Sequence, residues 1–186
     1  REKAFNMTST HKIQRMSALM STICSLSLIF LPLLIIWVWV DFDRINGTLE
    51  YLGNEFRPDT IALPNRILGF IFTMIPIALL MRGLLHLRAL FELFRKEQFF
   101  SQAKTKLLHS FAIMLLFSAL AAPVARALVS VAVTFNNVPG QRAVVANIDS
   151  HDLSSLFVAM VFLTVAWVMR ETRPAGGENA ASGVQS

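Results

Sequence analysis

A single arginine stands inside a long apolar stretch and is the residue with the clearest capacity for chemistry. Arg126 is the only charged residue between Leu107 and Thr134. An arginine at the centre of a membrane-spanning helix costs about 2.5–3.5 kcal/mol on insertion scales, so its position needs a physical reason. Three reasons are open. The side chain can contact an anion or substrate, it can reach the membrane interface, or it can pair with an acid of a neighbouring loop. The candidate acids are Asp41, Asp43, Asp149 and Asp152.

The residues around Arg126 suit a close helix contact and a bend. Small residues recur four apart, as in Ser118 and Ala122, and this spacing lets two helix backbones approach each other. Pro123 has no N–H to donate to the carbonyl of Ala119, and a proline inside a helix bends it. Arg126 and Pro123 are therefore the candidate intramembrane functional residues, although each feature also occurs in ordinary helix packing.

The other side chains that commonly do chemistry show no recognised arrangement. No histidine has metal-ligand spacing with another histidine, with the single cysteine or with an acid on one helix face. These residues are His11, His86, His109, His151 and Cys24. The sequence has no HExxH, GxSxG, Walker A or GxGxxG motif. These patterns predict no metal site, no cofactor and no catalytic residue, and hence that the protein is not an enzyme.

A second charged segment, 86–100, has a helical pattern. Its apolar side chains recur at i, i+3, i+4 and i+7, at Leu87, Leu90, Phe91 and Phe94. The opposite face carries charges at i,i+4 spacing, at Arg88, Glu92, Arg95 and Lys96. This pattern predicts an amphipathic helix that continues the preceding apolar stretch. The charged face is a candidate docking surface for a protein partner or for anionic lipid, or the helix simply lies on its own membrane.

Apolar and charged residues are segregated along the chain in a way that predicts four membrane spans. Of the 186 residues, 54% are hydrophobic and 16% are charged, against about 25% charged in typical soluble domains. A bilayer core about 30 Å thick needs roughly 20 apolar helical residues. Four stretches suit this length: about 18–40, 63–85, 107–134 and 153–169. The predicted fold is an all-α membrane protein, a four-helix bundle with an amphipathic cytoplasmic helix between spans two and three.

The basic residues predict which ends face the cytoplasm. With four spans, both termini share a side with the loop between spans two and three, and that side holds twelve of the 17 Lys and Arg residues. The other side holds four, and Arg126 lies within a span. Cytoplasmic loops carry the excess of Lys and Arg, so both termini are expected in the cytoplasm. The same asymmetry accounts for the net charge of +5 without a nucleic-acid partner.

The chain is expected to divide into three parts. Residues 1–14 form a cytoplasmic N-terminal segment, in which Met7 is a plausible start of the native chain. Residues 15–173 form the membrane domain, and the small polar residues 174–186 form a disordered tail. The first span has a basic flank and no small-residue cleavage site after it, which predicts an uncleaved anchor.

Two further expectations concern the ends of the spans. Trp37 and Trp39 lie where the first span ends, which is the usual place for an interfacial aromatic belt. Before the fourth span, residues 142–148 are expected to form a short strand, and either Asp149 or Ser150 to cap the helix that follows.

Three short segments, taken in order, resemble those of a bacterial membrane family known as domain of unknown function 2975. They are Leu93–Ser101 (LFRKEQFFS), Ile148–Leu153 (IDSHDL) and Ala166–Glu171 (AWVMRE). The resemblance covers roughly residues 15–180 and departs from the family at Glu97, where relatives often have glycine. It implies a four-span protein of the bacterial inner membrane and supplies no catalytic residue. Some relatives lie beside small helix-turn-helix regulators, which implies a regulatory role.

These observations predict a non-enzymatic accessory or regulatory membrane subunit. Such a protein would act through helix or loop contacts with membrane lipids, with a membrane-protein partner or with a second copy of the chain. The alternative is a small oligomeric transporter or channel subunit that uses Arg126. The near absence of polar residues at membrane depth favours the accessory subunit, because a substrate pathway needs a polar lining.

Overall fold

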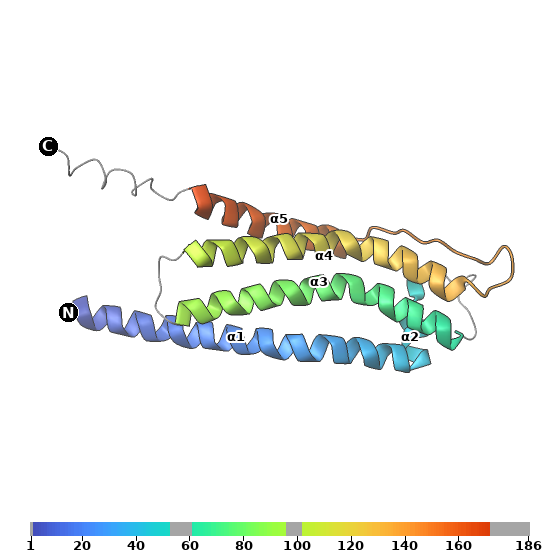
Figure 1. The fold of residues 1–186 in the computed structure, drawn as a ribbon, viewed down its shortest axis with the longest axis horizontal. Helices are drawn as coiled ribbons and strands as arrows, with labels where there is room; N and C mark the ends of the chain where they lie inside the picture. Colours follow the sequence, from blue (N-terminus) through green and yellow to red (C-terminus); the bar gives the residue numbers. More distant parts are fainter. Residues whose placement is uncertain (1, 53–60, 96–101, 172–186) are drawn as a thin grey trace.

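The computed structural model describes residues 2–52, 61–95 and 102–171, and within them all regular secondary structure is helical (Figure 1). The long helices are α1 (Glu2–Val40), α3 (Leu63–Arg95), α4 (Gln102–Thr134) and α5 (Ser150–Glu171). Two short helices follow α1, namely α2 (Phe42–Thr48) and the 3-10 helix η1 (Glu50–Leu52). The predicted disordered tail, 174–186, lies outside the described residues.

Each long helix contains a stretch that is long and apolar enough to cross a membrane. These stretches are Gln14–Val40, Leu63–Arg95, Gln102–Thr134 and Ser150–Glu171. They contain the four spans expected from the sequence and extend beyond them at one or both ends. The prediction of four membrane-spanning helices is therefore confirmed by their length and composition, and the chain is that of a multi-pass helical membrane protein.

The four long helices lie side by side in the order α1, α3, α4, α5. α3 packs against α1 on one side and α4 on the other, and α5 packs against α4. Figure 1 shows α1 and α5 at opposite edges, so the four helices of the expected bundle are arranged as an open layer. Large apolar side chains on both edge helices are exposed, for example Phe30 and Phe157. In a bilayer these faces can contact lipid without cost, which lets the layer remain open.

The buried core lies at one end of the layer, called here the α2 end. It joins Trp39 of α1, Ile45 of α2, Val133 of α4 and Ala143 of the segment before α5. In Figure 1 this is the end at which α2 and the connection from α4 to α5 are found. α2, η1 and the segment between α4 and α5 therefore pack against the long helices at the α2 end.

Trp39 packs into a space that only a glycine leaves open. Its side chain is buried, and a Cβ placed on Gly69 of α3 would overlap the indole ring, 2.6 Å from Cζ3. Trp37 is instead half exposed, with the guanidinium of Arg44 stacked 3.8 Å from the centre of its ring. Trp39 thus fills the contact between α1 and α3, and the interfacial position of the two tryptophans stays a prediction.

α3 and α4 meet at small residues and at a side-chain hydrogen bond. A Cβ on Gly83 would lie 3.3 Å from the Cβ of Met114, which marks a close backbone approach. The hydroxyl of Ser118 donates to the carbonyl of Pro76 across the contact at 2.8 Å. Both helices change direction near mid-length in Figure 1, and each contains an internal proline, Pro76 or Pro123. Prolines are common causes of such bends.

The Gly69 contact leads to a stability prediction. Replacement of Gly69 by alanine should lower the unfolding temperature of the purified protein by several degrees, because overpacking typically costs about 1–3 kcal/mol. The measurement is thermal unfolding in detergent followed by tryptophan fluorescence. Gly47→Ala is the control, since a Cβ there meets nothing within 4 Å. An equal effect of the two substitutions would contradict the proposed packing role of Trp39.

Candidate functional site

Three polar residues of α4 bind the segment that precedes α5. Arg126 Nη2 donates to the carbonyl of Asn147 at 3.0 Å. The hydroxyl of Ser130 accepts the N–H of Val145 at 3.0 Å, and that of Thr134 accepts the N–H of Ala143 at 3.2 Å. Arg126, Ser130 and Thr134 on one side, and Ala143, Val145 and Asn147 on the other, are called here the α4 ladder.

The α4 ladder forms because the spacing of its residues along α4 is nearly equal to the spacing of their partners along the extended segment. The residues of α4 are four apart, which is about 6 Å along a helix. Those of the partner segment are two apart, which is about 6.6 Å along an extended chain. One helix face can therefore meet every second residue of an extended segment running in the opposite direction. The match provides partners for backbone groups that would otherwise be buried and unpaired.

The hydroxyls of the ladder are oriented by their own helix. Ser130 donates its proton to the carbonyl of Ala127, and Thr134 donates to the carbonyl of Ser130, both at 2.7 Å. Each oxygen then presents lone pairs to an N–H of the partner segment. Both residues are buried, at 1% exposure or less. An apolar replacement would therefore leave a backbone N–H without a partner in a buried place.

The segment 142–148 is not a strand, although its burial alternates as in one. Ala143 is buried and Val145 is half-buried against the core, whereas Val144 and Ile148 are exposed. The expected strand is wrong because the partner is a helix, and no second extended segment lies beside it among the described residues. The period-two pattern thus identified the extended backbone but not its partner.

Arg126 also pairs with two acids at the start of α5. Its Nη2 contacts a carboxylate oxygen of Asp152, and its Nη1 lies 3.8 Å from Oδ2 of Asp149. The side chain of Asp152 is only 7% exposed and that of Arg126 27%. A carboxylate so well buried requires a cationic partner. Of the acids considered from the sequence, Asp149 and Asp152 bind Arg126, whereas Asp41 pairs with Arg44 at 3.3 Å.

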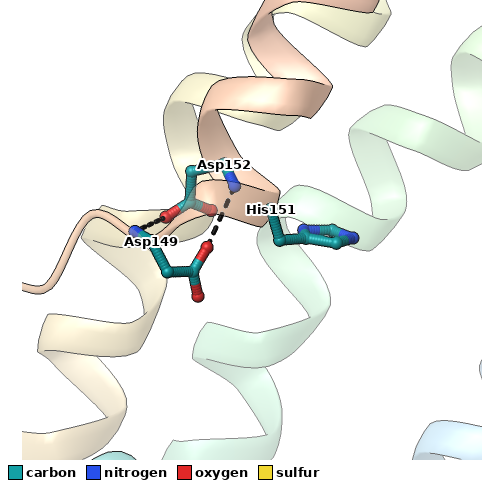
Figure 2. A group of neighbouring side chains, drawn as sticks. All are labelled: Asp149, His151 and Asp152. Carbon is teal, nitrogen blue, oxygen red and sulfur yellow. Dashed lines mark hydrogen bonds between the residues drawn. The ribbon is translucent and has the colours of Figure 1, made fainter.

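The two acids also cap α5 (Figure 2). Asp149 Oδ1 accepts the N–H of Asp152 at 3.0 Å, and Asp152 Oδ2 accepts the N–H of Asp149 at 3.1 Å. This reciprocal pair is a capping box with aspartate at both positions. Asp149, one of the two expected caps, therefore begins the helix. The positive end of the helix dipole also stabilises the two carboxylates.

Arg126 and Asp152 each begin a seven-residue repeat that continues along their own helices, α4 and α5. Steps of seven residues from Arg126 lead to Ala119 and Ala112, and the same steps from Asp152 lead to Ala159 and Ala166. All four alanines are buried, three of them with no exposed surface. A seven-residue repeat of small side chains suits closely packed antiparallel helices. The Arg126–Asp152 contact thus lies at the end of the small-residue seam that joins α5 to the layer.

His151 lies beside the same acids, but the group is better suited to the arginine than to a metal ion. The ligand atoms of Asp149, His151 and Asp152 lie within 4.8 Å of one another. In Figure 2 the imidazole extends to one side of the carboxylates. The oxygens that a divalent ion would bind already accept backbone N–H groups or face the guanidinium of Arg126. A metal ion would have to displace this cation.

A cavity of about 270 Å³ opens next to Arg126. It lies between α1, α2, α3 and α4, and apart from Arg126 and two threonines its lining is apolar. The lining includes Trp39, Pro76, Ala122 and Val129. Arg126 is therefore shared between the ion pair and the wall of a cavity that is large enough for a small apolar group.

The other candidate face, Arg88, Glu92, Arg95 and Lys96, lies far from Arg126. α3 runs without interruption to Arg95, so the predicted amphipathic helix is the final part of α3 as far as that residue. Arg88 and Glu92 pair at 3.1 Å, as expected, and Leu90 on the opposite face is buried. Lys96 lies outside the described residues. The structure therefore does not join the two candidate sites.

Comparisons with protein-family models, with curated proteins and with solved structures find no match to this chain. The resemblance to a family stays a prediction.

Ser130 and Thr134 are the site residues that the sequence analysis did not identify. Their signal is present, because they continue from Arg126 at i+4 and i+8 on an otherwise apolar helix. Polar residues at this spacing share one face and indicate a polar partner for that face. Neither residue belongs to a known motif, so the identity of the partner was accessible only from the tertiary structure.

Removal of one partner of the Arg126–Asp152 pair should destabilise the protein more than removal of both partners. Arg126→Met should destabilise the protein by about 3–5 kcal/mol, because it leaves a buried carboxylate unpaired. The double variant Arg126→Met, Asp152→Leu should recover most of this loss. The measurement is thermal unfolding of the purified variants. Arg44→Met, which breaks an exposed pair, is the control and should cost about 0–1 kcal/mol. Comparable losses for the two arginines would rule out a structural role for Arg126.

The α4 ladder should protect the amides that it binds. In the Ser130→Ala, Thr134→Val variant, the amides of Ala143 and Val145 should exchange with deuterium at least tenfold faster, because an unmade buried hydrogen bond costs about 1–3 kcal/mol. The measurement is hydrogen exchange with mass spectrometry of a peptide that covers 141–149. Thr164→Val is the control, since its hydroxyl bonds only within α5. Unchanged exchange in the double variant would show that the ladder contributes nothing.

Proposed function

We propose that this protein is a non-enzymatic accessory or regulatory subunit of the bacterial inner membrane, with both termini in the cytoplasm. Twelve of its 17 Lys and Arg residues lie on the side assigned to the cytoplasm, which supports the orientation. The resemblance to domain of unknown function 2975 supports the bacterial source. Four spans without a catalytic arrangement support a role exerted through contacts.

The observation that carries the proposal is the engagement of Arg126 with its own chain. Its guanidinium contacts the carboxylate of Asp152 and the carbonyl of Asn147, and faces Asp149. An arginine that binds substrate is typically available to an incoming anion, whereas two carboxylates here already offset its charge. The arginine at membrane depth thus stabilises the fold, and the surface exposed at the ends of the helices is left to make external contacts.

The contact surface proposed is the charged face at the end of α3. On this face Arg88 is paired with Glu92, and Arg95 adds a positive charge. Lys96 follows in the sequence and is included in the proposed surface from its helical spacing alone. Such a face suits an acidic protein partner or the headgroups of anionic lipid. Because it continues a span as one helix, a partner that binds there can displace or restrain the span itself.

The test is affinity purification from native membranes in a mild detergent, with identification of bound proteins and measurement of particle mass. The triple variant Arg88→Gln, Arg95→Gln, Lys96→Gln should retain at most about a tenth of the partner bound by the unmodified protein, since each basic residue contributes roughly fivefold. The matched control, Lys12→Gln, Arg15→Gln, Arg82→Gln, removes three charges assigned to the same side. Partner binding that is equal in the two variants would refute the proposed surface.

A second candidate, a small oligomeric transporter or channel subunit, is favoured by one observation. Arg126 lines the cavity of about 270 Å³ in addition to its ion pair, so a small ligand there would reach its guanidinium. A homo-oligomer without any partner in the purification would support this alternative. The Arg126→Met, Asp152→Leu variant, reconstituted in vesicles, would then be expected to lose flux while remaining folded.

A further inference from the structure

A groove between α4 and α5 is lined by three basic side chains. Lys106 and His109 come from α4 and Arg170 from α5, at the end of the layer opposite the α2 end. The groove has a volume of about 380 Å³, and the rest of its lining is the polar or small residues Gln102, Ala103 and Thr105. The groove is separate from the charged face of α3 and from the cavity at Arg126.

Within residues 102–171, no acidic side chain lines this groove, and neither Lys106 nor Arg170 takes part in an ion pair with any described residue. The contrast with the α2 end is clear, because there Arg44 and Arg126 face acids. Three convergent donors without a carboxylate suit an anion with several acceptor oxygens, such as a phosphate group.

The depth of the groove matches that of a lipid headgroup. Lys106 directly precedes the apolar stretch of α4 that begins at Leu107, and Arg170 directly follows the apolar stretch of α5 that ends at Met169. The groove therefore lies where two adjacent helices leave the hydrocarbon core on the same side. Trp167 is more than half exposed, at 58%, one turn before Arg170, which suits the interfacial position that tryptophan prefers.

We propose that this groove binds the phosphate headgroup of an anionic phospholipid. Lys106, His109 and Arg170 donate to the phosphate oxygens, and the acyl chains extend along the exposed apolar surface of α5, which includes Val165, Trp167 and Val168. Basic pockets between membrane helices on the cytoplasmic side are typical sites for such headgroups. A lipid held there would bridge α4 and α5 at the end opposite the Arg126–Asp152 pair. The site is independent of the proposed accessory role.

The experiment is native mass spectrometry of the full chain in a mild detergent, titrated with phosphatidylglycerol and, separately, with phosphatidylcholine. The unmodified protein should retain phosphatidylglycerol in preference. Lys106→Gln, Arg170→Gln should weaken its binding roughly 25-fold, because each basic side chain near an anionic surface contributes about fivefold. The control Arg15→Gln, Arg82→Gln removes the same charge from α1 and α3 and should bind phosphatidylglycerol normally.

A charge-preserving variant separates loss of binding from loss of folding. Lys106→Arg, Arg170→Lys keeps both cations and should bind phosphatidylglycerol within a few-fold of the unmodified protein. Equal retention of the two lipids, or equal weakening in the neutral variant and its control, would overturn the proposal. Displacement of the bound lipid by millimolar inorganic phosphate would also overturn it, because the groove would then be a site for a soluble anion.

Discussion

The charge of Arg126 must be compensated within an apolar helix, and the α2 end of the structure is organised around this requirement. The compensating carboxylate, Asp152, is itself almost completely buried, so neither group is stable in its position without the other. Their contact fixes the start of α5 beside the part of α4 that carries Arg126. The buried alanines Ala119 and Ala112 of α4, and Ala159 and Ala166 of α5, follow at intervals of seven from the two charged residues.

The same arginine connects helix packing to the path of a loop. Because Arg126 also binds the carbonyl of Asn147, the extended segment must run along α4, and Ser130 and Thr134 then meet its amides. A buried loop normally leaves backbone groups without partners. Here the side chains of one helix supply them, so the connection becomes part of the core. The segment packs on the Trp39 cluster through Ala143 and Val145.

The two ends of the layer therefore differ in their electrostatics. At the α2 end the cations of Arg44 and Arg126 are matched by acids of neighbouring segments. At the other end Lys106 and Arg170 line a groove that contains no acidic side chain in the part of the chain that the structure describes. A cation that is matched by an acid of its own chain stabilises the fold, whereas a cation without such an acid can bind an external anion. This asymmetry is the physical reason for assigning a structural role to Arg126 and external contacts to the end that carries Lys106 and Arg170.

The number and approximate limits of the long helices were predictable from the sequence, because an apolar run of membrane length is a local property. Local spacing likewise predicted the Arg88–Glu92 pair and a cap at Asp149 or Ser150, of which the structure shows Asp149. Only the tertiary structure decided which acids meet Arg126, that Trp39 is buried against Gly69, and that 142–148 binds a helix. These outcomes depend on residues distant in the chain, and in an almost uniformly apolar sequence many registers of adjacent helices look alike. The register was determined by a few polar contacts whose partners become visible only when the helices are placed together.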